Sequence, residues 1–420
     1  MDISSDVPAD TRADARADAR AATAGREALP SLTGLRFWAA LLVVCYHLSR
    51  EYHRLPVLSP LAWYGRDGVT FFFVLSGFVL AWSYPPSHSA SAVPARVFYW
   101  RRFARIWPLH LLTTGLALAA TLLLGAALPL TAVLWSLPLL QAWSPVQVYG
   151  GNPAAWSLSA EAWFYLLTPA LLRFLGRRGD RALRLLAVAA CAVGAVGWLG
   201  GALVGPPALR EWLLDYLPLT RTPQFLLGAV AAVAVRRGWR PPLRLGPAAV
   251  LVLVWHAALL PWSAAVPDRL WYSPYSGSQA LVAPLFALLV AAAAVRDRRP
   301  GGSGLLGSGP MRRLGHWSFA WYLVHQTCLR LVLALCGPPR GAWAAGAGWL
   351  AVTTASLGLA GALYQWVERP LERRLRAVGP QPPSSPPPTP PLVRRDPGPR
   401  VPRARIGGST RSQDRDGQLS

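Results

Sequence analysis

The chain has 420 residues, of which 53% are hydrophobic and 15% are charged, and its formal net charge is +23. Long apolar runs recur from Leu32 to Val367, so the sequence excludes a soluble enzyme and indicates a polytopic membrane protein. All 42 basic residues are arginine, which indicates a GC-rich genome, and most lie in short loops or near the C-terminus. Membrane topology and anionic lipid explain charge in those places, so nucleic-acid binding is not expected.

The apolar runs predict an all-α polytopic membrane protein with about ten transmembrane helices. Arginine is abundant in alternate loops and scarce in the others, which by the positive-inside rule places both termini in the cytoplasm of a bacterial plasma membrane. A crossing at the apolar stretch Leu128 to Trp143 would put the later arginine-rich loops outside, so we expect that stretch to be re-entrant or interfacial. The predicted spans are residues 33–49, 68–84, 107–128, 158–172, 185–203, 219–235, 247–262, 278–295, 315–335 and 343–367.

The predicted transmembrane domain, residues 31–376, is flanked by polar segments. Residues 1–30 carry an ADAR-type repeat without an apolar h-region, so we expect no cleavable signal peptide and targeting by the first span. Residues 377–420 are rich in proline, serine and arginine and offer little apolar surface to pack, so both ends are predicted to be disordered cytoplasmic tails. The four cysteines lack CxxC spacing and are interpreted as small core residues.

The first predicted span, LTGLRFWAALLVVCYHL, carries Arg36 near one end and His47 near the other. Ionisable groups at membrane depth are costly and mark candidate functional sites. The two residues lie within about 20° of the same helix face and roughly 16 Å apart along the axis, so we expect them to face one cavity. An apolar setting favours the neutral imidazole, which can take a proton from a hydroxyl group. A core histidine bonded to a backbone carbonyl is the alternative for His47.

Asp67 lies at the predicted outer edge of the second span. A carboxylate that contacts a histidine fixes its tautomer and stabilises the imidazolium, and His47 is near enough in the predicted topology for such a contact. An ordinary surface charge is the alternative interpretation of Asp67.

The most concentrated basic segment beside a span contains Arg101, Arg102 and Arg105. Topology alone is one explanation of this segment. The other is a phosphate site, because arginine donates paired, charge-assisted hydrogen bonds to phosphate oxygens and the segment lies on the side where nucleotide-bearing donors occur. Arg36 is predicted near the same membrane face and can join such a site.

Glu161 is the one acid in the apolar helix that also carries Ser159 and Tyr165. A charged and unpaired carboxylate there would cost several kcal/mol, so an ion pair with an arginine is the favoured role and direct proton transfer is the alternative. Ser159 and Tyr165 are structural or substrate-binding candidates on the same helix.

A polar stripe is predicted on the ninth span, where Ser318, Tyr322 and His325 follow at spacings of four and three. Hydrogen bonding between helices explains such a stripe as well as substrate binding does. Arg221 begins another span as a hydrogen-bond donor or an interfacial anchor. These four residues are therefore structural or substrate-binding candidates.

Several kinds of chemistry lack their sequence patterns. There is no Walker A loop, GxGxxG, HExxH or GxSxG pattern, and the histidines are not at metal-ligand spacing. We therefore expect no bound cofactor and no metal.

Five motifs follow one another over roughly residues 31–375. They are Gly34-Leu35-Arg36 followed by His47, Phe72-Phe73-Val74-Leu75-Ser76-Gly77-Phe78, Arg102-x-x-Arg105-Ile-x-Pro108, Trp156-Ser157-Leu158-Ser159-x-Glu161-x-x-Phe164-Tyr165, and Tyr322-Leu323-x-His325 with Glu368-x-Pro370. By these motifs the chain resembles the bacterial membrane acyltransferase family 3, whose members O-acylate sugars of surface polysaccharides, lipopolysaccharide and, in actinomycetes, antibiotic scaffolds. The resemblance implies that Arg36 and His47 form the functional pair and that acyl-CoA, often acetyl-CoA, is the donor.

We therefore expect an integral-membrane O-acyltransferase that acts on a hydroxyl of a sugar, surface glycan or polyketide-type metabolite. His47, helped by Asp67, would act as a base on that hydroxyl, while Arg36 and the basic segment hold the phosphates of the donor. Transient acylation of His47 is an open alternative mechanism.

Two further expectations concern the chain as a whole. The segment after Val378 is too short and irregular for the esterase-type domain that some relatives carry, so transfer is expected within the membrane domain or with a partner. A carrier or flippase that binds an amphipathic metabolite is the alternative function. Such a protein should show inverted repeats, and none is evident in the sequence.

Overall fold

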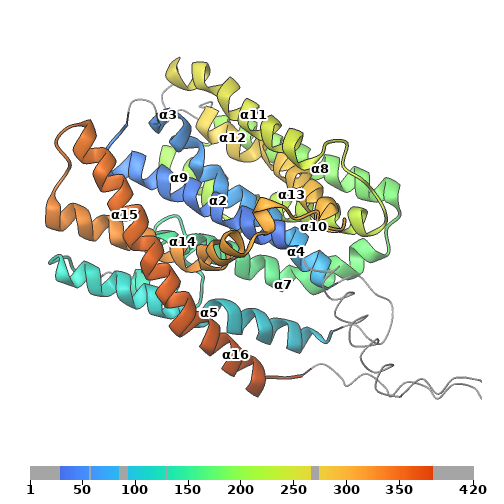
Figure 1. The fold of residues 1–420 in the computed structure, drawn as a ribbon, viewed down its shortest axis with the longest axis horizontal. Coiled ribbons are helices and arrows are strands. Elements are labelled where there is room, and N and C mark those ends of the chain that lie inside the picture. The colour runs from blue at the N-terminus through green and yellow to red at the C-terminus, as the bar shows by residue number, and fades with distance from the viewer. Residues whose placement is uncertain (1–28, 56–57, 85–92, 129, 266–273, 382–420) are drawn as a thin grey trace, which may run out of the picture. The chain divides into compact units, whose positions relative to one another are not determined.

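The fold was obtained as a computed structural model, which describes residues 29–55, 58–84, 93–128, 130–265 and 274–381 (Figure 1). All regular elements in this part of the chain are helices. Most of the two predicted disordered tails, residues 1–28 and 382–420, lies outside the described residues. The last helix continues through Val378, two residues beyond the predicted domain boundary.

Each predicted span has a helix at its position. The helices are α2 (Pro30–His47), α3 (Ser59–Ala62), α4 (Asp67–Ser83), α5 (Ala95–Leu123), α6 (Leu130–Ser136), α7 (Trp156–Gly176), α8 (Asp180–Gly200), α9 (Pro207–Glu211), α10 (Pro218–Arg236), α11 (Leu245–Ala265), α12 (Pro274–Leu281), α13 (Ala283–Asp297), α14 (Gly309–Cys336), α15 (Ala342–Leu363) and α16 (Arg369–Val378). Short π-helical turns cover Leu48–Tyr52, Trp212–Tyr216 and Tyr364–Glu368, and 3-10 turns cover Trp63–Arg66, Gln141–Trp143, Pro153–Ala155, Gly201–Leu203 and Leu305–Gly307.

Seven helical segments of the described chain are long and apolar enough to cross a membrane, which supports a multi-pass membrane protein. Helices α7, α10 and α13 are not among them, and α13 has only 15 residues. Because α10 is buried along most of its length, its side chains need not be as apolar as those of a lipid-facing helix. The count of about ten spans therefore stays a prediction. The seven segments are Pro30–Tyr52, Ser59–Ser83, Ala95–Leu123, Asp180–Gly200, Leu245–Ala265, Gly309–Cys336 and Ala342–Val378.

The stretch expected to be re-entrant or interfacial contains α6, a helix of seven residues that is too short to cross a bilayer. The chain then turns at Leu139, which has a positive φ of 59°, and continues into Gln141–Trp143. The hydroxyl of Ser159 on α7 donates to the Leu139 carbonyl at 2.6 Å, so Ser159 has a structural role. This hydrogen bond fixes the turn against the helix that carries Glu161.

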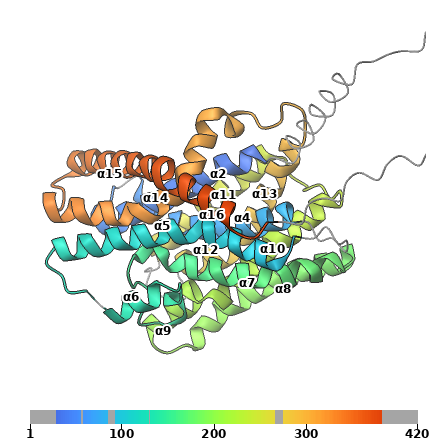
Figure 2. The same ribbon diagram turned by 90° about the horizontal axis from the view of Figure 1, so that it is seen from below.

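Helices α4 and α10 pack face to face near the middle of the bundle (Figures 1 and 2). A Cβ on Gly77 would lie 2.0 Å from the Phe225 carbonyl oxygen, and a Cβ on Gly228 would lie 1.8 Å from the Val74 carbonyl oxygen. Small residues let two helix backbones approach this closely. The contact fixes α4, whose side chains form walls of the cavities described below.

We expect Gly228→Ala to destabilise the protein by about 1–3 kcal/mol, because the added methyl group overpacks the α4–α10 contact. Thermal unfolding of the purified protein in detergent would measure the loss. Gly197→Ala in α8 is the matched control, since nothing lies within 4 Å of a Cβ there. Equal melting temperatures for both variants would contradict the close α4–α10 approach.

Candidate active site

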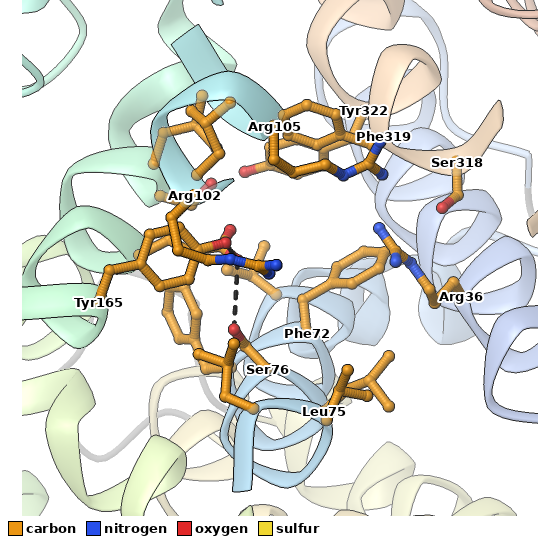
Figure 3. A pocket seen from close by; sticks show the side chains of 18 residues that line it. Arg36, Phe72, Leu75, Ser76, Arg102, Arg105, Tyr165, Ser318, Phe319 and Tyr322 are labelled. Atoms are coloured by element: carbon orange, nitrogen blue, oxygen red, sulfur yellow. Dashed lines mark hydrogen bonds between the residues drawn. The ribbon is translucent and has the colours of Figure 1, made fainter. Parts of the chain in front are cut away.

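A first cavity of about 120 Å³ lies between α2, α4, α5, α7 and α14 (Figure 3). Arg36 enters it from α2, Arg102 and Arg105 enter it from α5, and Ser318 and Tyr322 belong to α14. Arg101 does not line it. The remaining lining residues are Val69, Phe72, Phe73, Leu75, Ser76, Val79, Leu80, Ile106, Ser157, Leu158, Glu161, Tyr165 and Phe319.

Two of the arginines in this first cavity lack an ionic partner in the described part of the chain. Neither Arg36 nor Arg102 makes an ion pair there, and the Nε atom of each is buried without a hydrogen-bond acceptor. Arg102 packs over the ring of Tyr165, with 5.8 Å between its guanidinium carbon and the ring centroid. A buried donor without an acceptor costs free energy, so both side chains favour an anionic ligand.

Arg105 differs because it pairs with Glu368 and with Glu372, the latter at 3.1 Å. These contacts join α5 to the π-helical turn Tyr364–Glu368 and to α16, which lies beside α5 (Figure 2). Arg105 is therefore held in place at the edge of the first cavity by two carboxylates.

The expected ion pair between Glu161 and an arginine is absent from the described residues. Glu161 accepts hydrogen bonds from the Tyr165 hydroxyl at 2.6 Å and from the Ser76 hydroxyl at 3.2 Å. Tyr165 lies one helical turn further along α7, so its hydroxyl reaches the carboxylate locally. The prediction of an Arg–Glu latch at this residue was wrong, and the latch is formed by Arg105 and Glu368 instead.

A second cavity of about 340 Å³ contains His47. Its walls combine aromatic rings with charged side chains, and it includes the ion pair Arg66–Asp215 at 2.7 Å. The Tyr149 and Tyr216 hydroxyls are hydrogen-bonded at 2.6 Å within the same wall. The other polar and aromatic lining residues are Tyr46, Arg50, Glu51, Trp156, Gln279, Tyr322, Gln326 and Arg330.

The two cavities meet at Val69 of α4 and Tyr322 of α14, which line both. Arg36 and His47 therefore face two neighbouring cavities rather than one, and the prediction of a shared cavity was wrong. The reason is that side chains from α4 and α14 reach the space between the two ends of α2. Helical periodicity places both residues on one face, but it contains no information about these neighbours.

The imidazole of His47 is paired with a second histidine. Its Nδ1 lies 2.9 Å from the Val43 carbonyl oxygen and 3.1 Å from Nε2 of His325, and the two ring centroids are 4.9 Å apart. His325 is 1% exposed, and its Nδ1 lies 2.7 Å from the Tyr322 carbonyl oxygen. His325, the last residue of the polar stripe on α14, thus contacts His47, the candidate base on α2.

The expected contact between Asp67 and His47 is not present among the described residues. Asp67 accepts hydrogen bonds from His256 Nε2 at 3.0 Å and from the Ser278 hydroxyl. Asp67 follows the 3-10 turn Trp63–Arg66, and that turn directs it toward α11 and α12 rather than toward α2. The sequence did contain a signal for this partner, because His256 is an ionisable residue within the predicted apolar span 247–262.

Arg221 and Ser318 make contacts within the protein. Arg221 donates to the Asp215 carbonyl oxygen through Nε at 2.8 Å and through Nη2 at 2.6 Å, and it also donates to Gln279. It thereby supports the turn that presents Asp215 to Arg66. Ser318 donates to the Gly315 carbonyl oxygen at 2.7 Å.

Sequence reasoning missed several residues of the two cavities. Arg66, Asp215 and Glu51 line the second cavity, and Glu368 fixes Arg105 beside the first. Arg66 directly precedes Asp67, so its charge at the start of a span was a visible signal. Asp215 and Glu368 lie in π-helical turns, and no local pattern marked their partners.

Comparison with known proteins decides the family. Residues 29–365 match the model of a family described as an acyltransferase domain. The chain belongs to this acyltransferase family. It is 34% identical over 376 residues to acyltransferase MdmB of Streptomyces mycarofaciens, covering 83% of this chain and 92% of that protein. Protein 2 in the picA locus of Rhizobium radiobacter is 39% identical over 88 residues, which cover 21% of this chain and 43% of that protein. No solved structure matches the chain.

Membership in this family confirms the resemblance deduced from the five motifs. The protein is an enzyme that transfers acyl groups, and its apolar helices support membrane location. The alternative of a non-catalytic carrier has no support from these relatives.

We expect Asp67→Asn and His256→Leu to destabilise the protein non-additively, because both remove one buried contact between α4 and α11. Their coupling energy should be about 0.5–3 kcal/mol, as found for residues in direct contact. Denaturant unfolding of the two single variants and the double variant in detergent would measure it.

The matched comparison combines Asp67→Asn with His47→Ala, for which the free energies of unfolding should simply add. Coupling in that second cycle, and not in the first, would show that Asp67 acts with His47 after all.

Proposed function

We propose that the enzyme transfers an acyl group, most simply acetyl, from acyl-CoA to a hydroxyl of a sugar, surface glycan or polyketide-type metabolite. The observation that carries this proposal is the pair of neighbouring cavities with unlike chemistry. The first holds arginines without anionic partners, the second holds His47 among aromatic rings, and both share Val69 and Tyr322.

The first cavity suits the donor. The phosphates of coenzyme A would supply the acceptors that Arg36 and Arg102 lack, and arginine binds phosphate oxygens in paired, charge-assisted hydrogen bonds. Arg105, held by Glu368, keeps a third positive charge at the edge. The basic segment lies on the side predicted to be cytoplasmic in a bacterial plasma membrane, where acyl-CoA is present.

The second cavity suits the acceptor. Rings of Tyr149, Trp156 and Tyr216 offer apolar faces beside polar edges, which is typical of sites for amphipathic ligands with several hydroxyls. Glu51 and the Arg66–Asp215 pair provide acceptors and donors for such hydroxyls. An acceptor bound here would place a hydroxyl near His47.

Transfer would then follow by direct attack. His47 takes the proton of the acceptor hydroxyl, and the hydroxyl oxygen bonds to the carbonyl carbon of the thioester. The carbon–sulfur bond breaks, and the leaving thiolate takes the proton from the imidazolium. The products are an ester and free coenzyme A, so protons and electrons balance without a further reactant.

We expect His47→Ala to abolish the transfer of label from radioactive acetyl-CoA into a base-labile ester in membranes supplied with a host extract. The reason is the loss of the base that activates the hydroxyl, a contribution of about 10²–10⁴-fold in rate. His53→Ala is the matched control, since the contact of His53 with Trp349 uses only its backbone oxygen.

Label that persists in His47→Ala would contradict the general-base role. Absence of label with both the wild type and His53→Ala would point to a donor other than acetyl-CoA.

We expect Arg36→Ala and Arg102→Ala each to raise the KM for acetyl-CoA by about 10–100-fold, the equivalent of one charge-assisted hydrogen bond. Steady-state kinetics with varied donor would measure this change. Arg101→Ala provides the control, because Arg101 is on the same helix but does not line the cavity. Equal effects of all three substitutions would indicate a general effect of surface charge rather than a donor site.

A further inference from the structure

The contacts of His325 determine which of its nitrogens carries a proton. Nδ1 lies 2.7 Å from the Tyr322 carbonyl oxygen and 3.3 Å from the Trp321 carbonyl oxygen. A carbonyl oxygen only accepts hydrogen bonds, so Nδ1 must be the donor. In the neutral ring Nε2 is then left with a lone pair and needs a donor of its own.

That donor is His47. Nε2 of His325 lies 3.1 Å from Nδ1 of His47, and two acceptors cannot bond to each other, so Nδ1 of His47 carries the proton. The Val43 carbonyl oxygen, 2.9 Å from the same Nδ1, is a second acceptor for this N–H group. Nε2 of His47 consequently holds the free lone pair, and it has no hydrogen-bond partner among the described residues.

We infer that His325 is a positioning residue, which together with the Val43 carbonyl oxygen holds His47 in the tautomer that has its basic nitrogen, Nε2, available to the acceptor hydroxyl. This inference rests on the proposed role of His47 as the base. His325 thus has the role expected of Asp67, that of the group that orients a catalytic imidazole.

A neutral imidazole suits this position for a physical reason. His325 is buried beside apolar residues of α14, where a carboxylate in its place would carry a large desolvation cost. When His47 takes a proton, its Nδ1–H remains bonded to His325 and the positive charge is stabilised there. His325 does not carry the proton away, because its own Nδ1–H is held by a backbone carbonyl oxygen.

A purely structural histidine is a weaker explanation of the same contacts. The hydrogen bond from Nδ1 to Tyr322 would satisfy that role and would leave Nε2 buried without a donor. Among the described residues, His47 is the only hydrogen-bond partner of Nε2 of His325. The arrangement therefore links the two rings rather than simply filling the core.

The test compares three substitutions of His325 in the acetyl-transfer assay with purified enzyme. His325→Leu removes the acceptor at similar volume. His325→Gln places an amide oxygen near the position of Nε2. His325→Asn carries the same amide on a side chain that is one bond shorter, so the amide does not reach that position. We expect Leu and Asn to lower kcat at least tenfold, with the KM of acetyl-CoA within twofold of wild type, and Gln to recover most of the loss.

If His325 has only a structural role, the substitutions should lower the melting temperature and the folded yield, and kcat should not differ between His325→Gln and His325→Asn. Equal kcat for Gln and Asn, or wild-type kcat for Leu, would overturn the inference. If His325→Leu does not fold, the difference in kcat between His325→Gln and His325→Asn still tests the positioning role.

His47→Ala in the same assay separates this inference from the proposed function. Persisting transfer in His47→Ala means that the proposed role of His47 as the base has failed, and with it the premise of this inference. Loss of transfer in His47→Ala together with full activity in every His325 variant refutes only the positioning role.

Discussion

A charge or polar group buried in an apolar interior must find a partner, because leaving it unpaired costs several kcal/mol. This constraint explains why ionisable side chains join distant helices of the protein. Asp67 joins α4 to α11 through His256, and Arg105 joins α5 to the turn before α16 through Glu368. Several buried polar atoms of the described chain lack a partner, and among them those of Arg36 and Arg102 belong to cations that make no ion pair. Both of these side chains line the same cavity. These two arginines indicate where a bound ligand would supply the anionic group that the protein itself does not provide.

Three π-helical turns bring residues to the two cavities. The turn Leu48–Tyr52 directly follows His47 and presents Glu51 to the second cavity. The turn Trp212–Tyr216 presents Asp215 to Arg66, and the turn Tyr364–Glu368 presents Glu368 to Arg105. A π-helical turn has one extra residue in its hydrogen-bonded ring, so it rotates the side chains that follow relative to a regular helix. Such turns are frequent at functional sites, and here each carries an acidic side chain, namely Glu51, Asp215 or Glu368.

The sequence predicts the helices and the identity of the important charges well, since both follow from apolar length and from the cost of burying charge. Arg36, Arg102 and Arg105 do line one cavity, as the basic segment suggested. The partners are not predictable in the same way. Asp67 was expected to contact His47 and contacts His256, and Glu161 was expected to contact an arginine and contacts Tyr165. Partner choice depends on helix rotation and on π-helical turns, neither of which leaves a periodic signal in the chain.

The separation of the two cavities has a consequence for an acyltransferase of this design. A thioester beside a base in a wet cavity is open to attack by water, and enzymes suppress such side reactions by excluding solvent from the reacting atoms. Val69 and Tyr322 line both cavities, and His47 lines only the second. If the first cavity binds the donor phosphates, the proposed base is therefore not part of the wall that faces them. Under the proposed function, the thioester carbon meets His47 only at this boundary, which a bound acceptor fills with its own hydroxyl. Under the proposed function, this arrangement would favour transfer over hydrolysis.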